Sequence, residues 1–172
     1  SEVGQVEVTI APKTVTAPTI TLFDENGDPL VSFTYDGNAK EPAVTVVDGD
    51  KLIGAGEYEI RYANNIDAGS NTAVVNIIDK PGGNYTVTGS MTFVIEKADI
   101  VFAPAPTAAA ITYDGKPHEL LIPGTTSGGE VLYALNSATS RYDAAIPQAT
   151  EAGDYTVYYK VVGDKNHNDF AV

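Results

Sequence analysis

The sequence predicts an all-β protein made of two tandem antiparallel β-sandwich modules, and three observations support this prediction. Most apolar stretches alternate with polar residues at a period of two, which is typical of strands with one buried face. Turn-forming pairs such as Asn26-Gly27 and Asp48-Gly49 separate these stretches. The third observation is a long internal repeat. No window of a dozen residues carries the apolar stripe of an amphipathic helix.

The repeat joins two motifs in each half of the chain. Residues 33–37 (FTYDG) return as residues 111–115 (ITYDG), 78 positions on (113 − 35). Residues 67–69 (DAG) return as residues 151–153 (EAG), 84 positions on (151 − 67). A recurrence of about 80 residues is longer than that of solenoids and propellers, and it fits small whole domains in tandem.

The first module spans residues 13–97, and its strands follow from alternation and from β-branched and aromatic residues. Residues 58–62 (YEIRY) alternate strictly. Residues 91–95 (MTFVI) are more continuously apolar, as expected of a strand near the centre of a sandwich. The predicted strands lie at 16–23, 31–36, 43–48, 57–63, 71–79 and 85–96.

The second module spans residues 98–172 and repeats the pattern with fewer strands. Turn pairs at Asp114-Gly115 and Gly128-Gly129 separate them. The predicted strands lie at 99–103, 109–113, 118–122, 130–135 and 154–162. The chain reaches residue 172 where the strand that matches residues 90–95 should begin, so we expect this module to lack its last strand.

The N-terminal segment looks like a strand without a module of its own. Residues 4–10 (GQVEVTI) resemble residues 89–95 (GSMTFVI), the closing strand of the first module. We therefore expect residues 1–12 to be the closing strand and linker of a preceding module. The second module should then have an open sheet edge, and unpaired edges accept added strands. We predict strand exchange, in which residues 5–10 of another molecule fill that edge.

One motif refines the fold. Residues 151–157 (EAGDYTV) resemble the tyrosine corner of immunoglobulin-like domains, in which a tyrosine hydroxyl bonds to the backbone upstream. The resemblance gives Gly153 and Tyr155 structural roles and places Val157 where an antibody domain has a cysteine. The first module has Asn71 at the tyrosine position, so its corner must be closed differently. The implied fold is two tandem immunoglobulin-like β-sandwiches, with a small β-grasp-like variant as the alternative description.

Together these motifs resemble the YDG and MBG types of bacterial extracellular repeat, over most of residues 13–172. The match includes the two YDG turns, residues 56–58 (GEY) and residues 146–153 (IPQATEAG). Such repeats form stalks of long surface proteins, between an anchor and a binding or catalytic tip, and share no active site. The resemblance implies an extracellular location, at the cell surface or in the cell wall, with neighbouring repeat modules as partners.

Composition excludes several classes of function. The net charge is −13, and the 10 basic residues are scattered, so we expect no binding to nucleic acid. No apolar run approaches the roughly 20 residues that span a bilayer, so we expect no membrane span in this segment. The chain has no cysteine and therefore no disulfide, which does not exclude secretion. Its first residues are not a signal peptide, and we expect any export or anchoring signal to lie outside this segment.

A metal site is suggested only in the first module. Asp24, Asn26 and Asp28 place oxygens at alternate positions, as the start of a calcium loop does. Pro29 stands where that loop needs glycine, and a hairpin with Asn26-Gly27 at its tip explains the same residues. The two histidines, His118 and His167, lack ligand partners in the sequence, and we expect both to be exposed loop or strand-edge residues. We predict no cofactor.

We expect no enzyme. Asp36-Gly37 and Asp114-Gly115 recur at the same place in both modules, which indicates turns rather than paired catalytic carboxylates. No nucleophile elbow or phosphate-binding loop is present. An intramolecular lysine–asparagine isopeptide bond stays open as an alternative, with Lys40, Lys97 and Lys160 as its candidate lysines.

The function that we predict is mechanical: a non-catalytic spacer that presents a distal domain. The alternative is an adhesin that binds carbohydrate or a host protein. Aromatic faces stack on sugar rings, and the second module offers loop 136–145 and four tyrosines for that purpose, although strands also favour half-buried tyrosine. These binding candidates are Tyr133, Tyr142, Tyr158 and Tyr159.

Overall fold

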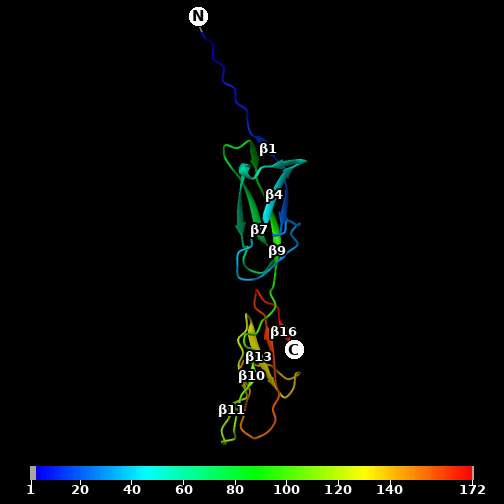
Figure 1. Cartoon of the computed structure of the whole chain (residues 1–172), viewed down its shortest axis with the longest axis vertical. Helices are drawn as coiled ribbons and strands as arrows, with labels where there is room; N and C mark the ends of the chain where they lie inside the picture. The colour runs from blue at the N-terminus through cyan, green and yellow to red at the C-terminus, as the bar shows by residue number, and fades with distance from the viewer. Residues whose placement is uncertain (1–2, 172) are drawn as a thin grey trace. The chain divides into compact units, whose positions relative to one another are not determined.

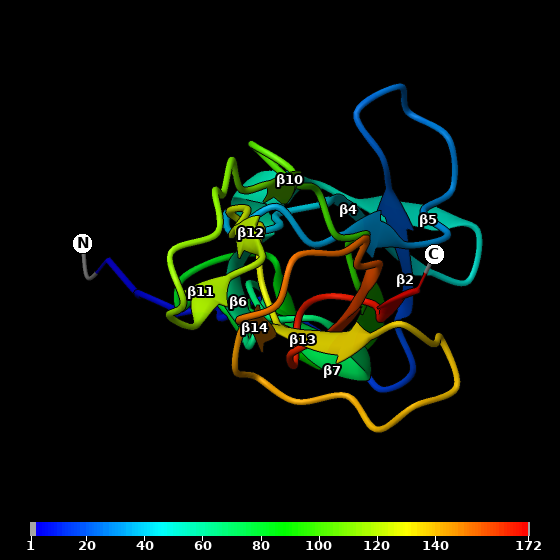
Figure 2. The ribbon, with the colours of Figure 1, turned by 90° about the horizontal axis from the view of Figure 1, so that it is seen from below.

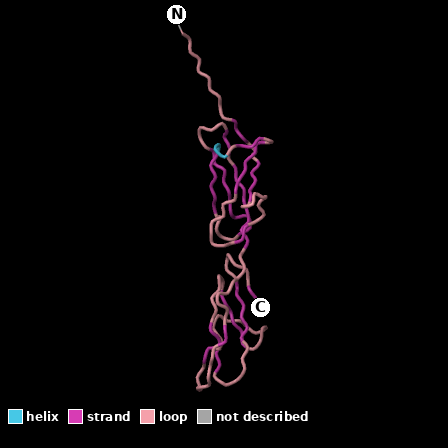
Figure 3. The backbone as a smooth tube through the Cα atoms, in the orientation of Figure 1, coloured by secondary structure: helices cyan, strands magenta, loops and turns pink. Residues whose placement is uncertain are grey.

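The computed structural model describes residues 3–171 and consists of strands, turns and loops. Its only helical element among those residues is the short 3-10 helix η1, Ala55–Glu57, drawn in cyan in Figure 3. The all-β class is thereby confirmed. The chain divides into two compact units. The first unit runs to residue 95 without residues 34–36, and the second unit holds residues 34–36 and the chain from residue 96 on. Residues 1–2 of the predicted segment 1–12 and residue 172 of the predicted second module lie outside the described residues.

The first unit contains two main sheets, and their longer strands are visible in Figure 1. A three-stranded sheet has the order β2-β4-β5, and a four-stranded sheet has the order β3-β9-β7-β6. A parallel pair, β1 with β8, joins the start of the unit to the segment before β9. The bounds are β1 Lys13–Val15, β2 Thr19–Phe23, β3 Phe33–Thr34, β4 Ala43–Asp48, β5 Lys51–Ile53, β6 Tyr58–Ala63, β7 Gly69–Asp79, β8 Tyr85–Val87 and β9 Gly89–Glu96.

The core of the first unit follows from the period of two. Ala73, Val75 and Ile77 of β7 are buried, as are Phe93 and Ile95 of β9. Alternate residues of a strand point to one face, so β7 and β9, which pair antiparallel, contribute to one buried surface. Burial of each valine, isoleucine or phenylalanine side chain contributes about 1.5–3 kcal/mol, which stabilises a chain without disulfides.

The second unit has shorter strands in three sheets. Figure 2 shows β10 beside β12 and β11 beside β14, and the third sheet has the order β13-β15-β16. Its buried apolar residues are Leu121, Tyr133, Ala134 and Val161. The bounds are β10 Thr107–Ala108, β11 His118–Glu119, β12 Leu121–Ile122, β13 Glu130–Leu135, β14 Gln148–Ala149, β15 Val157–Val162 and β16 Phe170–Ala171.

The two units share local geometry at matching positions. The Lys13 amide donates to the Asn84 carbonyl at 2.8 Å, and the Ala98 amide donates to the Asn166 carbonyl at 2.9 Å. Both contacts belong to parallel pairings. In the β6–β7 ladder Tyr62 lies opposite Val75, and in the β13–β15 ladder Tyr133 lies opposite Tyr159. An offset of 84 residues relates Val75 to Tyr159 (159 − 75), the offset of the second repeated motif.

Some predicted strands differ from the observed ones. The stretch predicted at 85–96 is two strands, β8 and β9, and 118–122 divides into β11 and β12. No strand forms at 109–113, and the stretch 99–103 contains only an isolated bridge, between Phe102 and Thr126. Strand β5 was not predicted. It forms because the positive φ of Gly49 (61°) allows the tight turn that returns the chain beside β4.

Residues 5–10 adopt no strand, although their pattern alternates. This segment runs outward from β1 as an extended trace, dark blue in Figure 1. Val6 and Ile10 are 85% and 93% exposed, because no sheet of the first unit lies beside them. Alternation gives a segment the propensity for a strand, but the strand itself requires a partner.

Candidate binding groove

The two YDG turns have the same backbone geometry. Gly37 has a φ of 82° and Gly115 a φ of 77°, values that strain any residue with a side chain. The Asp114 carboxylate accepts hydrogen bonds from the Lys116 amide at 2.9 Å and from His118 Nε2 at 2.8 Å. The bond from His118, followed by the backbone amide, lowers the pKa of Asp114. In the second unit this aspartate therefore organises the turn before β11.

The predicted corner residues lie at the edge of the second unit. The Tyr155 hydroxyl donates to the Glu151 carbonyl at 2.9 Å, which closes the segment that leads into β15. Gly153 is exposed, and a Cβ placed there would lie 3.7 Å from the Tyr155 ring, an ordinary contact. At the matching place of the first unit, Asn71 has a φ of 57°.

The candidate calcium residues form a hairpin tip after β2. The Asp24 carboxylate accepts from the Asn26 amide at 2.9 Å and from the Asp28 amide at 3.0 Å. The Gly27 amide donates to the Asp24 carbonyl at 3.1 Å. One side-chain oxygen of Asp24 is thus engaged by the turn itself. Within residues 3–171, no three acidic or histidine side chains gather as a metal ion would require.

The four candidate tyrosines lie on two faces of the β13–β15 ladder. Tyr133 is buried opposite Tyr159, whose ring packs edge-on against Phe102 at 5.5 Å between centroids. Tyr158 follows Tyr159 in the strand and therefore faces outward, where it is 37% exposed. Tyr142 lies under the ammonium group of Lys160, 4.6 Å from the ring centroid. The structure brings Tyr133 together with Tyr159 but does not gather all four rings on one surface.

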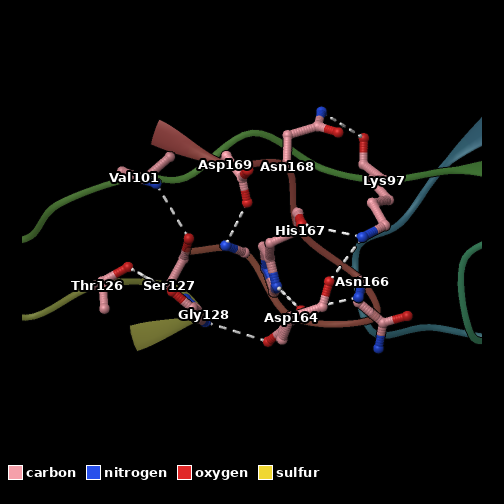
Figure 4. A network of polar contacts seen from close by, with 12 residues as sticks. Lys97, Val101, Thr126, Ser127, Gly128, Asp164, Asn166, His167, Asn168 and Asp169 are labelled. Carbon is pink, nitrogen blue, oxygen red and sulfur yellow. Dashed lines mark hydrogen bonds and ion pairs between the residues drawn. The ribbon is translucent and has the colours of Figure 1, made fainter. Parts of the chain in front are cut away.

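A polar network holds the start of the second unit against its last loop. We call this set the polar clamp, and Figure 4 shows it: Lys97, Asp164, Asn166, His167 and Asn168. The Lys97 ammonium donates to the Asp164 carbonyl at 2.8 Å, and the Asn168 side chain donates to Asp99 at 2.9 Å. The Asp164 carboxylate accepts from His167 Nδ1 and from the Asn166 amide, both at 2.8 Å.

The expectation that His167 is an exposed residue is wrong. His167 is 9% exposed and Asn166 is 6% exposed, because the clamp folds the loop over them. The bond from His167 is the largest cause that lowers the pKa of Asp164 to about 2, and amides of Asn166 and Gly129 add to it. A Cβ on Gly128 would lie 2.2 Å from His167 Nδ1, so this close approach requires glycine. Polar loop residues carry no periodic pattern, so this network could not be predicted from the sequence.

The second unit also contains a groove between two extended segments. Two hollows of about 340 and about 150 Å³ share Ala108, Leu120 and Tyr155 and form one groove, lined by residues 106–113, 118–121 and 149–159. Ile111 and Tyr113 line the larger hollow and are 42% and 62% exposed. Val157 and Tyr159 line the smaller hollow, and Tyr155 lines both. The groove is lined by both apolar and polar groups, and the larger hollow includes His118, Glu151 and Asp154.

Comparisons of the chain with protein-family models, with curated proteins and with solved structures find no match. The groove, the clamp and the turns therefore have to be interpreted from their own geometry. The part of the chain that the structure describes contains no helix of the length and apolarity needed to cross a membrane.

Proposed function

We propose that this chain is a non-catalytic spacer from a bacterial extracellular surface protein, where it presents a distal domain. In this proposal the two units are immunoglobulin-like modules of the YDG and MBG type. The all-β architecture and the matching turns, ladders and parallel pairings of the two units support it.

The observation that carries the proposal is that no unbonded residue separates the end of strand β9 from the polar clamp. Strand β9 extends through Glu96, and the next residue, Lys97, already donates to the Asp164 carbonyl. The Asn168 amide donates to the Ala98 carbonyl at 2.8 Å, and Asn168 also bonds Asp99. Every residue from Glu96 to Asp99 is thus engaged in a strand or in the clamp. A connection without flexible residues suits a part that has to hold a distance under load.

A distance measurement tests this proposal. The chain has no cysteine, so Lys51→Cys and Ala138→Cys, both at exposed positions, give one labelled site in each unit. We expect a narrow distribution of distances between spin labels on these sites. Insertion of Gly-Ser-Gly-Ser between Glu96 and Lys97 should widen the distribution. Equal widths with and without the insertion would contradict a stiff spacer.

An adhesin is the second candidate, and the outer face of the β13–β15 ladder favours it. Tyr158 is 37% exposed on that face, and the Lys160 ammonium group beside it in the strand lies 4.6 Å from the centroid of the Tyr142 ring. A glycan array tests this candidate with the whole chain. Stacking on a sugar predicts binding that Tyr142→Ala removes and Tyr142→Phe retains, because phenylalanine keeps the aromatic face. An array without reproducible binding would dismiss it.

A further inference from the structure

We propose that the free edge of strand β6 is a self-association surface, on which β6 of a second copy of this chain adds as an antiparallel strand. The contact joins the four-stranded sheets of two copies into one continuous sheet. It lies within the first unit and does not depend on the spacer role.

Strand β6 is the last strand of its sheet. In the order β3-β9-β7-β6, β7 is its neighbour among the described strands and pairs with it along all of Tyr58–Ala63. Successive residues of a strand direct their amide and carbonyl to opposite sides, so every second residue of β6 turns these groups away from β7. A row of unpaired backbone groups on a sheet edge accepts another strand. The edge of the first unit therefore offers a place where a strand can be added.

The second unit indicates which residues of β6 point outward. Tyr62 of β6 and Tyr133 of β13 hold the same place in the two ladders compared above. The Tyr133 amide donates to the Asp143 carbonyl at 2.8 Å, and its carbonyl accepts from the Asp143 amide at 2.9 Å. Because a residue directs both groups to one side, Asp143 lies on the side of β13 away from β15. The same orientation in β6 turns the backbone groups of Tyr58, Ile60 and Tyr62 away from β7.

The second unit covers this edge with its own chain, and the first unit does not. Residues 136–156 join β13 to β15, which is long enough for Asp143 to fold back onto the outer side of β13. Residues 64–68 join β6 to β7 and are too short to do the same. The Lys40 amide donates to the Asn65 carbonyl at 2.8 Å, which places the segment before β4 beyond the end of β6. Among the described residues no strand covers the outer side of β6.

The charges of β6 are complementary to themselves. Glu59 and Arg61 lie on one face of the strand on either side of Ile60, and their side chains are 52% and 69% exposed. In an antiparallel pair centred on Ile60, Glu59 of each copy lies opposite Arg61 of the other. Opposite charges across a strand pair stabilise it, and like charges destabilise it. A register centred on Glu59 or on Arg61 places like charges opposite each other, so the register centred on Ile60 is favoured.

Ile60 contributes an apolar contact at the centre of this register. Its side chain is 36% exposed, whereas Tyr58 and Tyr62, which share its face, are buried and half-buried. In the dimer the two isoleucine side chains lie directly opposite each other, and Tyr58 of each copy lies opposite Tyr62 of the other. Side chains that are directly opposite in an antiparallel pair are close enough to pack together. The register that pairs the charges therefore also covers the exposed isoleucine.

The contact is isologous, because the same strand serves both copies. An isologous contact closes at two copies, whereas a contact between two different surfaces propagates or closes into a ring. A strand of six residues buries a small area, so we expect a weak dimer that forms at high concentration.

The first test measures the mass of the intact chain by sedimentation, from micromolar to millimolar concentration. A salt concentration of about 0.15 M limits the repulsion that the net charge of −13 exerts between copies. We expect the mean mass to approach that of two chains and to rise no further. A chain that stays monomeric at millimolar concentration, or that grows beyond the dimer, overturns the proposal.

An exchange of charges tests the register. Glu59→Arg and Arg61→Glu each place like charges across the pair, so each variant alone should dimerise about tenfold or more weakly than the natural chain. In an equimolar mixture the positive pair of one variant faces the negative pair of the other, and mixed dimers should form about as tightly as natural ones. A chain with both substitutions should again dimerise with itself. Both side chains are exposed, so neither change puts the fold at risk.

The matched control is Lys116→Glu, which changes the net charge as Arg61→Glu does but lies at an exposed position of the second unit. This variant should dimerise like the natural chain. Single β6 variants that dimerise as well as the control, or a mixture of them that stays monomeric, overturn the register and the proposal with it.

Hydrogen exchange followed by NMR locates the surface in the intact chain. Between dilute and concentrated samples, exchange should slow at the amides of Tyr58, Ile60 and Tyr62 and stay unchanged at the two amides between them, which face β7. The other free sheet edge of the first unit is β5, Lys51–Ile53, and it serves as the internal comparison. Slower exchange at β5 without a change at β6 assigns the contact to another strand and overturns the proposal.

Discussion

The first and second units carry the same repeated motifs but close their cores to different extents. Among the described residues, eleven of the fifteen buried hydrophobic ones belong to the first unit and four to the second. The first unit has an eight-residue strand, β9, inside its main sheet, whereas the strand on that side of β15 has two residues, β16. The difference teaches that long paired strands such as β9 bury more apolar surface than two-residue strands such as β10, β11, β12 and β14 of the second unit.

The largest expected effect comes from removing the central aromatic residue of that strand. Phe93→Ala should destabilise the first unit by about 3–5 kcal/mol, because it leaves a cavity beside Phe33 and removes their edge-on contact. Thr92→Ala, at an exposed position of the same strand, should change stability by less than about 0.5 kcal/mol. Chemical unfolding followed by residue-resolved NMR measures both. Equal effects of the two variants would mean that β9 does not close this core.

The next effect is a difference in stability between the units. The second unit buries fewer apolar side chains, so we expect it to unfold first on heating and the chain to show two transitions. Each kcal/mol of difference separates the midpoints by about 4–8 °C in units of this size. Calorimetry of the intact chain, with NMR to assign each transition, measures the separation. A single transition in which both units unfold together would contradict a difference in stability between the two units.

A smaller effect belongs to the corner of the second unit. Tyr155→Phe removes the hydroxyl that donates to the Glu151 carbonyl and should lower the stability of the second unit by about 0.5–1.5 kcal/mol. Tyr158→Phe is the control, since that outward tyrosine lies three residues on in the same segment. The free energy of unfolding from denaturant titration distinguishes them. A loss of stability no larger than that of the control would show that the hydrogen bond at the corner does not stabilise the second unit.

The smallest expected effect is the loss, at acid pH, of the stability that the Asp164 carboxylate contributes. The pKa of Asp164 is about 2 in the folded unit, below its ordinary value of 3.8, so the carboxylate stabilises the fold above that ordinary value. This contribution is lost as the pH falls toward 2. Asp164→Asn should therefore lower the stability of the second unit at neutral pH, and its difference from the natural chain should shrink on acidification. A difference that is constant with pH would show that the charge of Asp164 has no part in the clamp.

The local sequence pattern predicted the features of the fold that depend on residues a few positions apart. Strands β4 and β13 have the predicted bounds, 43–48 and 130–135, because alternation and flanking turn residues both act within a few positions. The clamp joins Lys97 to Asp164, which is 67 residues away, through polar side chains without any period. Residues 5–10 show the converse, since their pattern is that of a strand but the first unit supplies no partner. The groove likewise is lined by segments that are distant in sequence, within residues 106–113, 118–121 and 149–159, so no single stretch of sequence predicts it.

The fit of Gly128 against the His167 ring has a practical consequence for finding related proteins. With a Cβ at that position 2.2 Å from Nδ1, and a Cβ on Gly163 2.2 Å from the His167 carbonyl, both positions tolerate only hydrogen. A genome search can therefore use two glycines, 35 positions apart (163 − 128), followed by Asp164 and His167, as a filter. Chains that pass it should hold the loop at residues 163–168 of the second unit as this chain does, and chains with alanine at either position must hold that loop by other contacts.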